Sequence, residues 1–296
     1  MWEGSCRPHM DTYAPIAGTI LIGFVCGVLG LVWTLRVLRD WRVTCRRPDG
    51  RRVVTGAGLG LAVSAVLAAL VAQILQFDPL IGGASWVCVL TVAIMAVAGL
   101  LADSAHPAVR PGVVAPLRGR GRGTGTTGAL KSLGALAAAL LGARLLAPAS
   151  TTELVVNAAL ILVWAHLLDS VATGPGRALK VYWVCWFALL LFVSPAASLR
   201  TIPLAIASML IGPYDLSGRA RVGSAGALAL GASLGLSACT GIASLGARVL
   251  LVAGGLCVSV YLAWRPLRAV TREHPALAVI DAWGTPSAAT PEAEDE

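Results

Sequence analysis

The sequence predicts an all-α protein, a polytopic bundle of about nine transmembrane helices. Hydrophobic residues make up 57% of the 296 positions and charged residues only 13%, whereas soluble domains carry about 25% charged residues. Apolar runs close to the length that a helix needs to cross a bilayer recur along the chain. Because these runs are spread over the whole length, one bundle is expected rather than several domains.

The nine predicted helices follow from these runs in order, with the shorter runs lengthened at their ends. Their expected ranges are 14–36, 53–76, 80–101, 129–148, 153–172, 180–196, 199–214, 222–239 and 246–264. The first run is longer than the apolar region of a signal peptide and no obvious cleavage site follows it, so a retained span is expected. The bundle is assigned to residues 1–272, a cytoplasmic amphipathic segment to 273–284 and a disordered acidic tail to 285–296.

Basic residues predict the orientation of the bundle. Of the 23 lysines and arginines, 19 follow the first, third, fifth, seventh and ninth spans, and 4 lie on the other side. Cytoplasmic loops carry such an excess, so the N-terminus is expected outside and the C-terminus in the cytoplasm. This asymmetry also explains the net charge of +8. The chain is therefore expected to be a multi-pass protein of the plasma membrane, and no nucleic-acid partner is expected.

Four predicted cytoplasmic loops hold most of the polar residues, and glycine is dense in them. They cover residues 99–107, 123–131, 166–180 and 215–226. Glycine allows the close backbone approach that phosphate-binding loops use, and each loop leads into a helix whose N-terminal amides attract anions. Glycine and serine also make plain tight turns between spans, so one such loop carries little weight. Four of them on one face favour a shared site for a phosphate group.

Only two of the basic residues are lysines: Lys131 in the stretch TGALK and Lys180 in the stretch GRALK. In a chain so rich in arginine, a lysine indicates that a compact ammonium group is needed. The phosphate of a nucleotide or lipid is a natural partner for it. The alternative is that both lysines extend to the membrane interface, and the residues alone leave the two interpretations level.

Two aspartates lie at the cytoplasmic ends of predicted spans. Asp103 ends the third span, and Asp169 lies near the end of the fifth. His166 precedes Asp169 by three residues, so the two share one helix face. An ionisable side chain at membrane level is a functional hypothesis by default. The alternative is an interfacial aspartate that is paired with water.

Six different motifs stand out between about residues 46 and 284: GRRVVTGAGL, GLLADS, TTGALK, PGRALK, DLSGRARVGSAGALALGA and REHPALAVIDAWG. They resemble the polyprenyl-phosphate N-acetylhexosamine-1-phosphate transferases (glycosyl transferase family 4). The resemblance implies transfer of a sugar-1-phosphate from a UDP-sugar to undecaprenyl phosphate, with Mg²⁺, in cell-envelope biosynthesis. It also implies that Asp103 and Asp169 are catalytic and metal-binding residues. The substrate phosphate-binding residues that it implies are Lys131, Lys180, Arg177, Thr126 and Thr127.

Three positions depart from the family pattern. The third span usually ends in two aspartates, but here Ala102 precedes Asp103, and the usual Asn-x-x-Asp of the fifth span is His166-x-x-Asp169. The aspartate of the family's LGDxG motif, a main Mg²⁺ ligand, is replaced by Ser224, which is neutral and a much weaker ligand. A serine there is also a good N-cap for the eighth helix. We therefore predict a degraded metal site, weak Mg²⁺ binding and a transferase activity that is impaired or lost.

Two other functions stay open from the sequence. The chain could be a non-catalytic membrane partner in envelope assembly, or a protein that binds or transports a lipid phosphate. Against a transporter, the predicted bundle has no chain of charges through its middle and no obvious inverted repeat. The expected ligands are a membrane lipid such as undecaprenyl phosphate and a UDP-sugar, and a homodimer is compatible with this class of protein.

Overall fold

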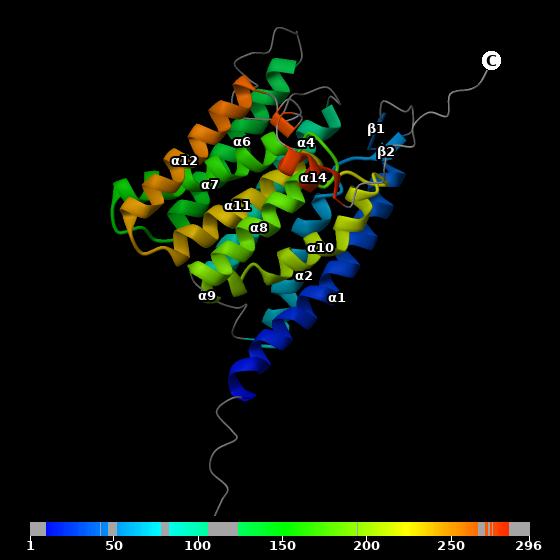
Figure 1. Cartoon of the computed structure of the whole chain (residues 1–296). Coiled ribbons are helices and arrows are strands. Elements are labelled where there is room, and N and C mark those ends of the chain that lie inside the picture. Colours follow the sequence, from blue (N-terminus) through cyan, green and yellow to red (C-terminus); the bar gives the residue numbers. More distant parts are fainter. Residues whose placement is uncertain are drawn as a thin grey trace, which may run out of the picture.

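A computed structural model describes residues 10–41, 43–46, 52–77, 83–105, 124–193, 195–265, 270–271, 273 and 275–283. Within them the protein is an all-α bundle with one short antiparallel hairpin (Figure 1). The elements are α1 (Met10–Asp40), β1 (Thr44–Arg46), β2 (Arg52–Val54), α2 (Leu59–Ile74), α4 (Gly83–Ala105), α6 (Thr124–Leu145), α7 (Thr151–Val171), α8 (Arg177–Phe192), α9 (Pro195–Leu199), α10 (Ile202–Leu216), α11 (Gly223–Gly241), α12 (Leu245–Trp264) and α14 (Pro275–Ala282).

Six of the described helices are long and apolar enough to cross a membrane: α1, α4, α6, α7, α11 and α12. They make the chain an integral membrane protein, as its composition predicts. The apolar helices α2 and α10 are shorter, with 16 and 15 residues. A 16-residue helix is about 24 Å long, which is less than the hydrocarbon thickness of about 30 Å. Helix α8 also has 16 residues and is therefore shorter than the hydrocarbon thickness as well.

The second predicted helix was expected to start at residue 53, and this boundary is wrong. Residues 52–54 form strand β2, and α2 begins only at Leu59. The extended backbone is held from a distant part of the chain, because the amide of Arg221 donates to the Val54 carbonyl at 2.8 Å. Gly56 then turns the chain with a φ of +73°, a conformation that a side chain disfavours.

Helix α11 forms the centre of the bundle and packs mainly against α7 and α4. Its small residues allow the backbones to meet. A Cβ at Gly231 would overlap the carbonyl oxygen of Trp164 on α7, and a Cβ at Gly99 on α4 would overlap the backbone of Ala225. The fold therefore fixes the positions of α4, α7 and α11 relative to one another, and these helices carry five of the residues singled out above: Ala102, Asp103, His166, Asp169 and Ser224.

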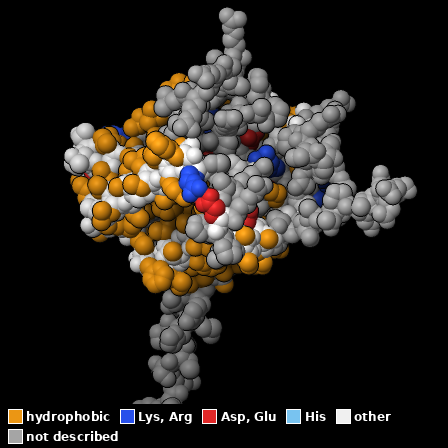
Figure 2. Space-filling model, turned by 45° about the horizontal axis from the view of Figure 1, so that its top comes forward, with side chains coloured by type: hydrophobic (Ala, Val, Ile, Leu, Met, Phe, Trp, Pro, Cys, Tyr) orange, Lys and Arg blue, Asp and Glu red, His pale blue; other side chains and the backbone are white. Residues whose placement is uncertain are grey.

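The hairpin and α14 lie at one end of the bundle, and the beginning of α1 lies at the other (Figure 1). Viewed toward the end that holds α14, hydrophobic side chains cover the flank, and several of the visible charged side chains lie near the middle of the view (Figure 2). The ends of α4 and α7 and the beginnings of α8 and α11 are also joined there by the contacts described below.

Candidate functional site

The N-terminus of α11 is capped by an aspartate from another helix. Asp103, near the end of α4, accepts hydrogen bonds from the backbone amides of Ser224 at 3.1 Å and Ala225 at 3.2 Å. These amides have no partner within their own helix, and the helix dipole favours a negative charge there. Gly223 has a φ of +68°, and a side chain on it would overlap the Asp103 carboxylate. The interpretation of Ser224 as the N-cap is therefore wrong, because Asp103 supplies the cap.

A buried ion pair lies beside this cap. The ammonium of Lys131 on α6 donates to Asp169 Oδ2 on α7 at 2.5 Å and to Ser224 Oγ at 3.1 Å. The exposed fractions of Lys131 and Asp169 are 5% and 0%. The structure thus brings Asp103, Lys131, Asp169 and Ser224 together from four helices. We call these four residues the central cluster.

The other predicted residues of this region lie as follows. Ala102 is buried next to Asp103 on α4. His166 is buried one turn before Asp169, and its Nδ1 has no hydrogen-bond partner among the described residues. Thr126 and Thr127 lie in the first turn of α6, but their side chains are outside the described part of the structure. The catalytic and binding roles of all these residues stay predictions.

The central cluster does not fit Mg²⁺ well. Both carboxylate oxygens of Asp103 are occupied by backbone amides, and Asp169 Oδ2 is occupied by the Lys131 ammonium. A divalent cation needs several negative or strongly polar oxygens, and a cation this close to an ammonium group is repelled. No group of three or more histidine, cysteine, aspartate or glutamate side chains that could hold a metal occurs in the described residues.

Arg177 and Lys180, at the start of α8, belong to a second cluster. The Arg177 guanidinium engages both carboxylate oxygens of Asp281 on α14, with a distance of 2.6 Å from Nε to Oδ1. Its Nη1 also donates to Thr173 Oγ1 at 3.2 Å. The ammonium of Lys180 donates to the backbone carbonyl of Asp281 at 2.8 Å. Two predicted phosphate-binding residues are therefore both engaged by the C-terminal helix.

Asp215, at the end of α10, was not singled out from the sequence. Its Oδ2 accepts from the amide of Gly176 at 2.6 Å, and its Oδ1 accepts from the amide of Val222 at 2.9 Å. Its exposed fraction is 5%. This one carboxylate therefore holds the loop before α8 and the loop before α11 in fixed positions. The signal was available, because Asp215 ends an apolar run just as Asp103 does.

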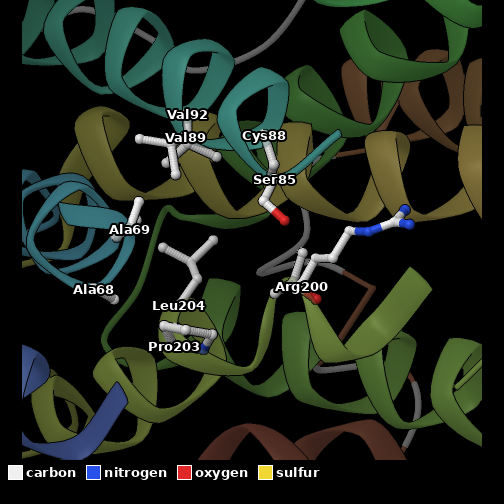
Figure 3. A pocket seen from close by; sticks show the side chains of 11 residues that line it. Ala68, Ala69, Ser85, Cys88, Val89, Val92, Arg200, Pro203 and Leu204 are labelled. Atoms are coloured by element: carbon white, nitrogen blue, oxygen red, sulfur yellow. The ribbon is translucent and has the colours of Figure 1, made fainter. Parts of the chain in front are cut away.

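A small cavity lies between α2, α4 and α10 (Figure 3). Its volume is about 20 Å³, enough for about one water molecule. Ser85 lines it, and the Ser85 hydroxyl has no hydrogen-bond partner among the described residues. Ser85 and Asp103 are near opposite ends of α4, roughly 27 Å apart along the helix axis at 1.5 Å per residue. This cavity therefore takes no part in the central cluster.

The fold and the two clusters define the class of the protein: a helical integral membrane protein with buried ionic residues gathered at the ends of its helices. Comparison with known proteins takes the assignment no further, because no family model matches the chain and no curated protein matches it.

Proposed function

We propose that the chain crosses the plasma membrane nine times, with its N-terminus outside and its C-terminus in the cytoplasm. Each of the nine expected spans overlaps one of the described helices, and α2, α8 and α10 are the three short ones. The excess of basic residues after the odd-numbered spans supports this orientation. The two clusters then face the cytoplasm, where nucleotides and lipid phosphates of the inner leaflet are available.

We propose further that the protein uses the scaffold of a polyprenyl-phosphate sugar-1-phosphate transferase to bind a phosphate-bearing lipid, and that it does not transfer the sugar phosphate. One observation carries this proposal: the Lys131 ammonium lies against Asp169 and Ser224, where the resemblance implies acidic ligands for Mg²⁺. The ammonium group neutralises the Asp169 carboxylate without any metal. Phosphoryl transfer then lacks the divalent charge that stabilises its transition state.

The expected ligand is undecaprenyl phosphate or a lipid of the same kind, with a UDP-sugar as the second candidate. Lys180 and Arg177 are the proposed phosphate-binding residues, since an ammonium and a planar guanidinium both suit phosphate oxygens. They lie at the N-terminal end of α8, where the helix dipole also favours an anion. Thr126, Thr127 and Lys131 stay predictions for the same role.

The test is a binding and transfer experiment on the whole chain in lipid nanodiscs. We expect undecaprenyl phosphate to raise the unfolding temperature, because a ligand that binds only the native state stabilises it. Arg177→Ala should reduce this rise, whereas Arg144→Ala, at an exposed position in the last turn of α6, should not. No radiolabelled sugar phosphate should pass from a UDP-sugar to the lipid, with or without Mg²⁺.

A pair of substitutions examines the metal site itself. Ala102→Asp together with Ser224→Asp adds two carboxylates, which outnumber the single Lys131 ammonium. We expect Mg²⁺ to protect this double variant from thermal unfolding and to leave the natural chain unchanged. Mg²⁺-dependent transfer by the natural chain would instead show an active enzyme and overturn the non-catalytic proposal.

A further inference from the structure

The contact between α14 and the start of α8 is an unusual use of two predicted phosphate-binding residues. Asp281 lies 104 residues after Arg177 and 101 after Lys180, so the contact is made by the tertiary fold and not by a local turn. The side chains of Arg177 and Asp281 are 12% and 25% exposed. Both charges are thus partly removed from water.

The chemistry of this contact matches that of a bound phosphate. A guanidinium group presents paired N–H donors that suit the two oxygens of a carboxylate or of a phosphate equally well. Arg177 uses such a pair on Asp281, and Lys180 donates to the carbonyl of the same residue. One residue of α14 therefore engages both cations, and a phosphate group that used them would have to replace it.

Two large apolar side chains on either side of Asp281 are exposed. Val279 of α14 is 71% exposed, and Trp283, just past the helix end, is 69% exposed. Upstream, Arg265 pairs with Glu273 at 2.6 Å, but these side chains are 51% and 45% exposed. Exposed ion pairs contribute little stability. The Asp281 contact, by contrast, is partly buried and holds the segment against the start of α8.

We propose that residues 275–283 form an intramolecular lid, in which Asp281 occupies the place of a phosphate group on Arg177 and Lys180. A phosphate monoester or diphosphate binds there by displacing Asp281, so the lid lowers the affinity of the site and opens when the ligand arrives. This inference rests on the proposed function, because it describes the regulation of the same phosphate site. The phosphate can come from a membrane lipid or from a soluble molecule.

The experiment compares Asp281→Asn with a matched control, Glu273→Gln, in the whole chain in nanodiscs. Both changes remove one negative charge from the C-terminal region, but Glu273 pairs with Arg265 and not with the site. Dissociation constants are measured for undecaprenyl phosphate in the nanodisc and for inorganic pyrophosphate in solution. Hydrogen exchange of the amides in 275–283 is measured on the same samples without ligand.

We expect Asp281→Asn to bind phosphate about 5- to 10-fold more tightly, the effect of removing a competing, partly buried charge-assisted contact. Amides of 275–283 should exchange faster in this variant, and Glu273→Gln should match the natural chain in affinity. A gain only for the lipid identifies a lipid phosphate as the ligand, and a gain only for pyrophosphate identifies a soluble one. Either result supports the lid.

Equal affinity in Asp281→Asn and the natural chain would overturn the lid and leave the proposed phosphate site standing. Weaker binding in Asp281→Asn would also overturn it, since Asp281 would then help to build the site. If neither the natural chain nor Asp281→Asn binds either ligand, the proposed phosphate site is wrong, and the proposed lid is wrong as well. Faster exchange in 275–283 then shows only that Asp281 anchors α14.

Discussion

Removing the ammonium of Lys131 should destabilise the bundle strongly. The side chain is 5% exposed and its partner Asp169 is 0% exposed, so Lys131→Met leaves a carboxylate inside the protein without its cation. Breaking a buried pair in this way costs about 3–5 kcal/mol. Methionine is unbranched and of similar length, so little of this cost comes from lost packing.

Two further variants separate the charge effect from other effects. Asp169→Asn keeps an oxygen that can accept from Lys131, and Ser224 still accepts as well, so we expect a smaller loss of about 1–3 kcal/mol. Replacing both partners in Lys131→Met with Asp169→Leu should come close to the natural stability, because no charge is left unpaired. Leu133→Met, on an exposed position of the same helix, is the matched control and should change little.

The measurement is thermal unfolding in detergent at neutral pH, with and without Mg²⁺. At about 2 °C per kcal/mol, Lys131→Met should unfold about 6–10 °C below the natural chain. Mg²⁺ should recover part of this loss in Lys131→Met and none in the control, since Asp169 is then available to a cation. An unfolding temperature within about 2 °C of the natural chain would refute the reasoning, because the pair would then not hold a buried charge.

Two other predictions concern the loops and the topology. Asp215→Ala leaves the amides of Gly176 and Val222 without their carboxylate partner, so we expect a loss of about 2–5 kcal/mol in unfolding free energy, measured by denaturant titration; an unchanged midpoint would contradict the role given to Asp215. For the topology, an impermeant thiol reagent on intact cells should label Ala149→Cys and not Ser104→Cys, both at exposed positions; labelling of Ser104→Cys alone would reverse the proposed orientation.

The sequence was sufficient to predict the helical segments and to select the residues of the central cluster. Both predictions rest on the free-energy cost of placing a charge or an unpaired backbone group in hydrocarbon. Apolar runs of the right length must therefore be helices, and charged residues at their ends must find partners. Asp103, Lys131 and Asp169 all satisfied this criterion and lie together in the structure.

The predictions that were wrong concern features that depend on contacts between residues far apart in the sequence. Residues 53–58 contain no charged side chain, so the sequence predicts a helix there. The structure instead has strand β2 at residues 52–54, which the backbone amide of Arg221 holds in place. Ser224 has the right type and position for a local N-cap, but the cap comes from Asp103, which lies 121 residues earlier in the chain. Local patterns contain no information about such partners, and Asp281 was missed as a partner of Arg177 for the same reason.

The central position of α11 has a consequence for how the protein is made. Its mean hydropathy is 1.2, against 2.3 for α4, and 89% of its span is buried inside the protein. A segment that faces other helices does not need the apolar surface that stabilises a lone helix in lipid. It therefore has a weak signal of its own for insertion by the translocon. Helices α4 and α7 are synthesised before α11, so α11 enters the bilayer when the helices that it packs against are already there.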